Sequence, residues 1–300
     1  MSLFSLLGAL EVGLIFSLVA LGVFISFRLL NFPDLTVDGS FPLGGAVCAT
    51  LISQGWNPYG ATLAAVAAGA AAGLMTGLLN VKLKIMDLLA SILMMIALYS
   101  INLRIMDRPN VPLIREPTLF TLLQPQAMDD SVFRPLLLAL IVLAAKFALD
   151  WFFATQRGLA IRATGSNARM ARAQGVNTGG MILLGMAISN ALVALAGALF
   201  AQSQGGADIS MGVGTIVIGL AAVIVGESIL PSRRLVWATL AVVLGAVVYR
   251  FFVALALNAD FIGLKSQDLN LVTALLVTFA LVLPMLKKRL RGKAGKGGGT

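Results

Sequence analysis

The sequence predicts an all-α polytopic membrane protein, and composition is the first reason. Of its 300 residues, 59% are hydrophobic and 12% are charged, whereas soluble domains average about 45–50% and about 25%. So few charges cannot cover two soluble domains of this total length. A bilayer crossing takes about 20 apolar residues, so the chain has room for about eight or nine transmembrane segments, a short or broken second one included.

The second reason is that charged residues and Pro or Gly breaks divide the chain into apolar segments. We expect these segments at residues 8–30, 42–54, 59–81, 86–105, 134–154, 179–203, 212–229, 235–256 and 269–286. The second segment is too short for a full crossing, so a broken or re-entrant helix is expected there. No basic residue precedes the first apolar run, which favours a membrane helix over a cleaved signal peptide. The predicted transmembrane domain therefore spans residues 1–286.

The distribution of charge predicts the orientation. The net charge is +9, and cytoplasmic loops of membrane proteins carry an excess of Lys and Arg. An N-out/C-in topology places nearly all basic clusters inside, among them Arg28, Lys82, Lys84, Arg157, Arg162, Arg169, Arg172, Arg233 and Arg234. A basic, Gly-rich cytoplasmic tail over residues 287–300 completes this set and is expected to be disordered. Topology thus explains the charge, and the expected partner of the basic groups is membrane lipid, with no nucleic acid.

The residue inventory excludes several chemistries. The chain has no histidine and a single cysteine, Cys48, so Ser-His-Asp triads, HExxH zinc sites and an intrachain disulfide are all excluded. An intramembrane enzyme built on paired carboxylates, such as Asp34 with Asp38, remains an alternative. We expect no enzymatic activity, no catalytic or metal-binding residue and no cofactor on this chain.

Two regions share a similar order of helix, polar break and small-residue helix. The first runs through PDLTVDGS and the other through SQGGADISMG. Because they would cross the membrane in opposite directions, an inverted repeat relating segments one to four with six to nine is compatible with the sequence. Two unrelated Gly/Ala-rich helix pairs are the alternative. Gly69, Gly73 and Gly77 recur every four residues on one helical face, which predicts close packing against another helix.

The connection at residues 156–178 is the longest one on the predicted cytoplasmic side. Its centre, ARMARAQ, favours a short helix with Ser166 or Asn167 as N-cap and Gly175 as the stop. Arg162, Arg169 and Arg172 would give the segment a positive surface. It could dock a partner protein or lie on anionic lipid.

Residues 158–177, GLAIRATGSNARMARAQGVN, resemble the coupling segment of bacterial ABC-importer permeases in the branched-chain amino acid/ribose permease superfamily. Residues 191–199, ALVALAGAL, and residues 30–45, LNFPDLTVDGSFPLGG, are also similar to that family, and the resemblance covers roughly residues 10–285. Residues 261–274 most resemble its tryptophan/tyrosine-type branch. Leu159 and Ala160 depart from the family, in which these positions are often basic or aromatic.

The resemblance implies the membrane-spanning permease subunit of an ABC importer in the bacterial cytoplasmic (inner) membrane, a multi-pass protein that carries a small polar, amino acid-like solute, an aromatic one included. It further implies a second permease subunit, with a homodimer as the simplest arrangement, two cytoplasmic ATP-binding subunits that hold ATP and Mg, and a periplasmic or lipoprotein solute-binding protein. The chain has no G-x-x-x-x-G-K-[ST] loop, so ATP must bind elsewhere. By the same resemblance, ATPase coupling is assigned to Arg162, Gly165, Ser166, Asn167, Arg169, Arg172 and Gly175.

Polar residues in the two breaks are the candidates for the substrate path. They are Asp34, Thr36, Asp38 and Ser40 in the 31–45 break, and Gln202 and Asp208 at the 203–212 break. Polar groups at membrane depth are costly and often functional. The alternative is that these groups cap helices or hydrogen-bond within the fold, and the same acidic breaks would also suit an autonomous ion-coupled secondary transporter. Asn190 is expected to form a helix–helix hydrogen bond, and Glu227 to pair with Arg233 or Arg234.

Overall fold

The computed structural model describes residues 3–114, 116–125, 129–232, 234–257 and 278. The predicted ninth segment at residues 269–286, the family-like stretch at 261–274 and the tail at 287–300 lie outside the described residues. The inverted repeat, which includes that ninth segment, stays a prediction.

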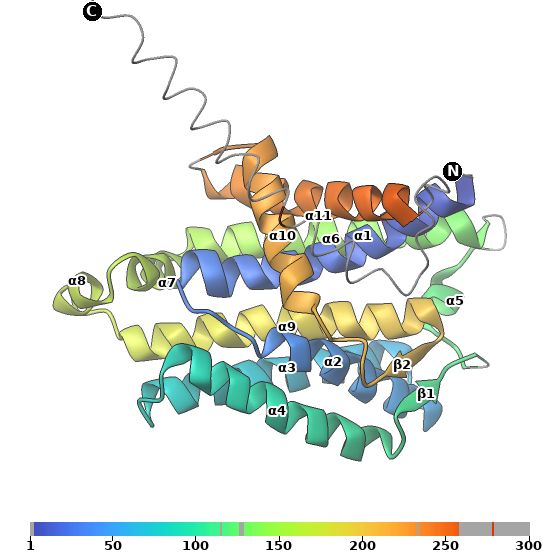
Figure 1. Ribbon diagram of the computed structural model, residues 1–300, viewed down its shortest axis with the longest axis horizontal. Helices are drawn as coiled ribbons and strands as arrows, with labels where there is room; N and C mark the ends of the chain where they lie inside the picture. The colour runs from blue at the N-terminus through green and yellow to red at the C-terminus, as the bar shows by residue number, and fades with distance from the viewer. Residues whose placement is uncertain (1–2, 115, 126–128, 233, 258–277, 279–300) are drawn as a thin grey trace, which may run out of the picture.

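The described residues form a bundle of α-helices, as predicted (Figure 1). Six helical stretches in the described part of the chain are long and apolar enough to cross a membrane. They are α1 (Leu3–Val23) with its π-helical continuation η1 (Phe24–Leu29), α3 (Pro58–Val81), α4 (Asp87–Met106), α6 (Asp130–Ala154), α9 (Thr178–Gln204) and α11 (Leu235–Leu257). Two shorter apolar helices are α2 (Val37–Ser53) and α10 (Thr215–Ile229).

Short elements occupy the two ends of the bundle (Figure 1). At one end lie α7 (Gln156–Ser166) and α8 (Ala168–Ala173); at the other lie α5 (Leu119–Leu123), β1 (Asn110–Pro112) and β2 (Gly206–Asp208). The strands form an antiparallel ribbon in which Asn110 pairs with Asp208 and Pro112 with Gly206. The purely α-helical prediction did not include this ribbon, because neither three-residue strand has a pattern that periodicity can detect.

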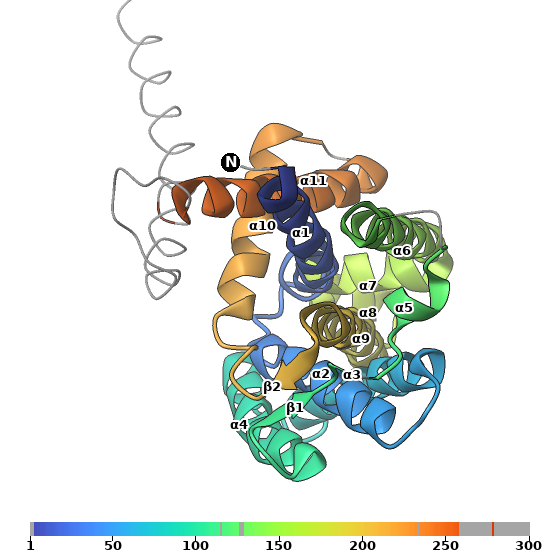
Figure 2. The same cartoon turned by 90° about the vertical axis from the view of Figure 1, so that its right-hand side faces the viewer.

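The second apolar segment is short, as predicted, but it is not broken, because α2 is one helix of 17 residues that begins at Val37. A re-entrant placement of this helix stays a prediction. Pro42 lies inside α2, where it removes one backbone donor without ending the helix. The helix is surrounded by α3, α4 and α9 (Figure 2). Its burial among other helices explains why so short a helix has an almost continuous run of small and apolar residues.

Glycine contacts bring α3 and α2 unusually close to the central helix α9. A Cβ atom at Gly73 of α3 would lie 2.2 Å from the carbonyl oxygen of Met186, and one at Gly69 would lie 2.5 Å from that of Asn190. The glycine face predicted for α3 is therefore confirmed as a close helix contact. Gly44 of α2 likewise faces α9, because its Cβ would lie 2.0 Å from the carbonyl oxygen of Ala194.

Candidate functional site

A buried polar cluster forms where the first break meets α9. Asn190 donates from Nδ2 to Oδ2 of Asp34 at 2.8 Å, and its Oδ1 accepts a hydrogen bond from Ser40 Oγ at 2.7 Å. The hydroxyls of Thr36 and Thr76 are 2.9 Å apart. All five residues are buried. Asn190 is thus a helix–helix hydrogen-bonding residue, as expected, and links the chain before α2 to α9.

Local sequence explains how the chain enters this cluster. After η1, Asn31 adopts a positive φ of 55°, a conformation that Asn tolerates better than most residues. Asp34 Oδ1 then accepts the backbone N–H of Thr36 at 2.9 Å, an Asx turn that reverses the chain into α2. The side chains of Asp34, Thr36 and Ser40 therefore have hydrogen-bond partners within the fold, mainly Asn190 and Thr76, which is the structural alternative; their part in a substrate path stays a prediction.

Asp38 caps a different helix from the one that contains it. Its Oδ1 accepts the backbone N–H of Ile216 at 2.7 Å, and its Oδ2 accepts that of Gly214 at 3.4 Å. These donors lie at the N-terminus of α10, where a negative charge is favourable. Asp38 thus ties the start of α2 to the start of α10.

Gln202 joins four helices near the opposite end of α9 from α7. Its Nε2 donates to Thr62 Oγ1 at 3.0 Å and to Cys48 Sγ at 3.2 Å, and its Oε1 accepts the N–H of Leu119 at 2.9 Å. The side chain is buried. These contacts account for a polar residue at this position without a bound solute.

Asp208, in the second break, is the predicted path residue that borders a hollow. The hollow has a volume of about 370 Å³ and is lined by Asn110, Pro112, Ile114, Phe200, Gln204, Gly205, Gly206, Asp208 and Met211. Oδ1 of Asp208 accepts the N–H of Ser210 at 2.8 Å and also its hydroxyl, and Oδ2 accepts from Asn110 Nδ2 at 3.3 Å. These hydrogen bonds, led by the Ser210 hydroxyl, hold the pKa of Asp208 below its ordinary value.

Sequence reasoning missed the apolar half of this hollow. Phe200 lies on the last turns of α9, and Met211 follows β2. No local pattern distinguishes them from core residues, and Asn110 lies 98 positions from Asp208. Only the pairing of β1 with β2 brings these residues together.

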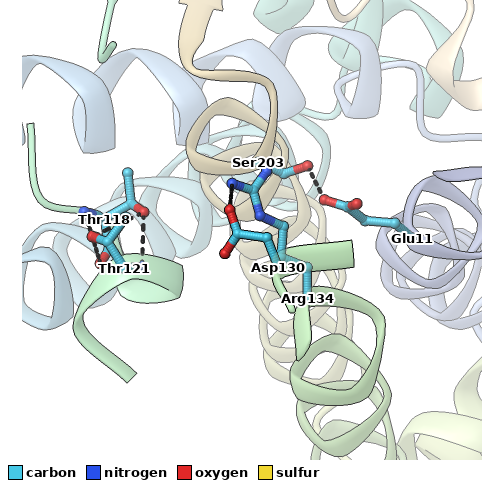
Figure 3. Close-up of polar contacts among 6 residues, drawn as sticks. All are labelled: Glu11, Thr118, Thr121, Asp130, Arg134 and Ser203. Carbon is cyan, nitrogen blue, oxygen red and sulfur yellow. Dashed lines mark hydrogen bonds and ion pairs between the residues drawn. The ribbon is translucent and has the colours of Figure 1, made fainter. Parts of the chain in front are cut away.

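Figure 3 shows further polar contacts at the same end of the bundle. Glu11 of α1 accepts a hydrogen bond from Ser203 of α9 at 2.6 Å. Arg134 pairs with Asp130 one turn earlier in α6 at 3.2 Å, and Thr118 and Thr121 form a reciprocal cap at the start of α5. These contacts connect α1 with α9, cap the start of α5 and pair two charges in the first turns of α6.

A buried ion pair in α6 was also missed, although its spacing is visible in the sequence. Lys146 Nζ lies 2.6 Å from Asp150 Oδ2, and Thr239 of α11 donates to Asp150 Oδ1 at 2.8 Å. Residues four apart share a helix face. The two charges neutralise each other within α6, and the hydrogen bond from Thr239 ties the pair to α11.

At the other end of the bundle, residues 156–178 contain two helices where one short helix was expected. Asn167 caps α8 by accepting the N–H of Met170 at 3.0 Å, and Gly175, with φ of +84°, follows it. Ser166 is instead the last residue of α7. Of the residues assigned to coupling, Arg162, Gly165 and Ser166 lie on α7, Asn167 caps α8, Arg169 and Arg172 lie on α8, and Gly175 lies just after it.

Helix α7 is held tightly against the end of η1. A Cβ atom at Gly165 would lie 1.9 Å from the carbonyl oxygen of Leu29, so no other residue fits there without displacing a helix. Beside this contact, Arg28 of η1 forms a two-pronged ion pair with Glu227 of α10, at 2.6 and 2.9 Å. Among the described residues, Glu227 thus pairs with Arg28 and not with Arg234, because α10 ends next to η1; Arg233 lies outside the described residues.

Comparisons with known proteins agree with this architecture. The family model described as branched-chain amino acid transport system, permease component, matches residues 5–286. A tyrosine transport system permease protein of Clostridioides difficile (strain R20291) is 38% identical over 265 residues, which are 88% of this chain and 86% of that protein. The uncharacterized protein RP368 of Rickettsia prowazekii (strain Madrid E) is 38% identical over 226 residues, 75% of this chain and 77% of the relative. No solved structure matches the chain significantly.

The match spans nearly the whole helical bundle. Together with the apolar helices it establishes a multi-pass membrane protein, consistent with the bacterial inner membrane, that is the permease component of an amino acid transport system rather than a member of an enzyme family. The chain belongs to the branched-chain amino acid transport permease family.

Proposed function

We propose that this chain is the membrane-spanning subunit of a bacterial ABC importer and forms the pathway for a small amino acid-like solute. The observation that carries the proposal is the exposed basic segment α7–α8, which is rigidly attached to the transmembrane helices. Arg169, Met170 and Arg172 are exposed on α8. A basic rim around an apolar residue that is 64% exposed suits a groove on a partner protein.

The attachment of α7 gives such a partner mechanical access to the membrane helices. Gly165 holds α7 against the last turn of η1, and η1 leads into the Asp34 turn. A partner that displaces α7–α8 would therefore displace η1 together with the Arg28–Glu227 pair. This is a rigid-body coupling in which the chain itself performs no chemistry.

The partner that fits is a cytoplasmic ATPase that carries the ATP and Mg. The chain lacks a phosphate-binding loop, so two ATP-binding subunits, a second copy of this permease and a solute-binding protein would complete the transporter. The N-out/C-in topology, with a ninth span at residues 269–286, places residues 156–178 on the ATPase side.

The name of the C. difficile relative supports an aromatic amino acid as the solute. The path is assigned to Asp34, Thr36, Asp38, Ser40, Gln202 and Asp208. In the inward-outward cycle, the hydrogen bonds of the first four would be exchanged as α2 moves against α9 and α10.

The test is reversal of charge on α8. Arg169→Glu with Arg172→Glu should abolish co-purification with the ATPase and ATP-driven uptake, whereas Arg108→Glu, exposed at the other end of the bundle, should change neither. Because Arg172 also donates to Thr178 at 3.2 Å, Arg169→Glu alone is the second variant. Retention of association and uptake by both α8 variants would contradict the proposal.

The alternative of an autonomous ion-coupled transporter has its own measurement. Proteoliposomes that contain this chain alone should show no uptake under a proton or sodium gradient. Gradient-driven uptake would favour the alternative.

A further inference from the structure

We propose that the hollow between the end of α9 and the β1–β2 ribbon binds the primary ammonium group of the solute through Asp208, with Phe200 and Met211 holding an apolar side chain. The proposal rests on the proposed function, because the topology places this end of α9 outside, where the solute arrives. The hollow is then the initial binding position of the solute, and the ammonium group is what Asp208 recognises.

The hollow has the size and the lining of a small-molecule site. Its volume of about 370 Å³ falls within the range of about 300–1,000 Å³ that is typical of ligand pockets. The lining combines apolar side chains with a few polar groups that converge from β1, β2 and α9. Such a mixture can fix one polar end of a ligand and contact its apolar end.

The charge of the hollow favours an ammonium over a carboxylate. Asp208 is the charged residue in its lining, and no described Lys or Arg lines it. Hydrogen bonds from Ser210 and Asn110 keep the carboxylate in place. An ionised carboxylate has about four acceptor positions, so these three contacts leave capacity for a donor from a ligand.

On the apolar side of the hollow, the ring of Phe200 is packed against other aromatic rings. The ring of Phe200 contacts Phe16 at 6.1 Å and Phe41 at 5.5 Å between centroids. Such a packed ring presents a fixed surface rather than a mobile one. Ile114, which is 85% exposed, adds apolar surface at the mouth. A ring or branched aliphatic side chain next to an ammonium group would match these positions.

A purely local role for Asp208 would be to hold the turn with Ser210. An Asn side chain would serve that role almost as well, because its oxygen accepts the same two hydrogen bonds. The negative charge strengthens the hydrogen bonds of the turn, but the turn forms without it, whereas recognition of a positive ligand requires the charge. Asp208→Asn therefore separates the two roles.

The experiment measures binding to the full chain in lipid nanodiscs by saturation-transfer NMR, without ATPase or binding protein. The probes are L-phenylalanine, phenethylamine, which lacks the carboxylate, and 3-phenylpropionate, which lacks the ammonium. Phenethylamine should bind and be displaced by L-phenylalanine, and 3-phenylpropionate should not bind. Asp208→Asn should weaken phenethylamine binding by about tenfold or more, Asp208→Glu should restore most of it, and Asp130→Asn, exposed at the same end of the bundle, should have no effect.

Equal binding of phenethylamine by the wild type and Asp208→Asn, or equal binding of the ammonium and carboxylate probes, would overturn this inference. If Asp208→Asn does not fold, the comparison of the two probes on the wild type and on Phe200→Ala decides. Loss of selectivity here with intact, α8-dependent uptake would reject only the ammonium site. Selective binding of the ammonium probe without α8-dependent uptake would reject only the proposal that the chain belongs to an ABC importer.

Discussion

The two polar breaks contain the same local turn in opposite surroundings. Asp34 accepts the N–H of Thr36 at 2.9 Å, and Asp208 accepts that of Ser210 at 2.8 Å. The first carboxylate is buried and meets Asn190 of α9, whereas the second borders an open hollow. The Asp34 turn thus joins helices by hydrogen bonds, whereas the Asp208 turn leaves its carboxylate next to an open hollow. Helix packing around a turn, and not the turn itself, decides which role it takes.

The largest effect is expected when the buried turn loses its partner. Asn190→Leu leaves Oδ2 of Asp34 and the Ser40 hydroxyl without their hydrogen bonds, and we expect a loss of about 3 kcal/mol or more in the free energy of unfolding. Thermal or denaturant unfolding in detergent measures it. The matched variant at the open turn, Asn110→Leu, should stay within about 0.5 kcal/mol of wild type. Similar losses of unfolding free energy in both variants would show that the two breaks do not differ in how strongly they stabilise the fold.

The second prediction concerns the packing that buries the first turn. In Gly73→Ala the new Cβ would meet the Met186 carbonyl oxygen at 2.2 Å, the oxygen that also accepts from Asn190 Nδ2 at 3.1 Å. Overpacking of this kind costs about 1–3 kcal/mol. Gly60→Ala, on the same helix with nothing within 4 Å, should be neutral or stabilising by up to about 1 kcal/mol. Equal melting temperatures for the two variants would show that α3 and α9 are not in close contact.

The third prediction uses pH at the open turn. Because the folded pKa of Asp208 is lowered, its ionised form adds stability above the ordinary pKa of 3.8, and that stability is lost as the pH falls through the folded pKa. Asp208→Asn should remove this contribution, so the difference in melting temperature between wild type and variant should shrink on acidification. A difference that is constant between about pH 6 and about pH 3 would contradict the assignment.

The smallest effect is expected for the Arg28–Glu227 pair at the other end of the bundle. Its side chains are 61% and 33% exposed, and exposed pairs contribute about 0.2–1 kcal/mol. A double-mutant cycle with Arg28→Gln and Glu227→Gln should give a coupling energy in that range, falling with added salt. A coupling above about 2 kcal/mol would mean that this surface pair resembles the buried cluster in strength.

Local chemistry predicted much of the fold, and its errors have physical causes. Periodicity located the long helices, and spacing located the Gly69–Gly77 face, because both depend only on neighbours along one helix. Glu227 pairs with Arg28 instead of the nearby Arg234, because Arg28 lies 199 positions away in sequence but adjacent in the bundle. The second segment was expected to be broken or re-entrant because the apolar run at residues 42–54 is short, whereas the helix begins earlier, at Val37, and continues through the polar residues of the break.

Hydrophobic composition and periodicity alone specify a multi-pass helical protein, because burying apolar helices in lipid requires no particular neighbour. The short turns are likewise local, since an Asx turn involves residues two apart. Whether such a turn joins helices or borders an open hollow depends on which distant segment packs against it. Asn190 reaches Asp34 across 156 positions, and Asn110 reaches Asp208 across 98. Such contacts arise only when the bundle has closed, because the glycine faces and the β1–β2 ribbon bring those segments together.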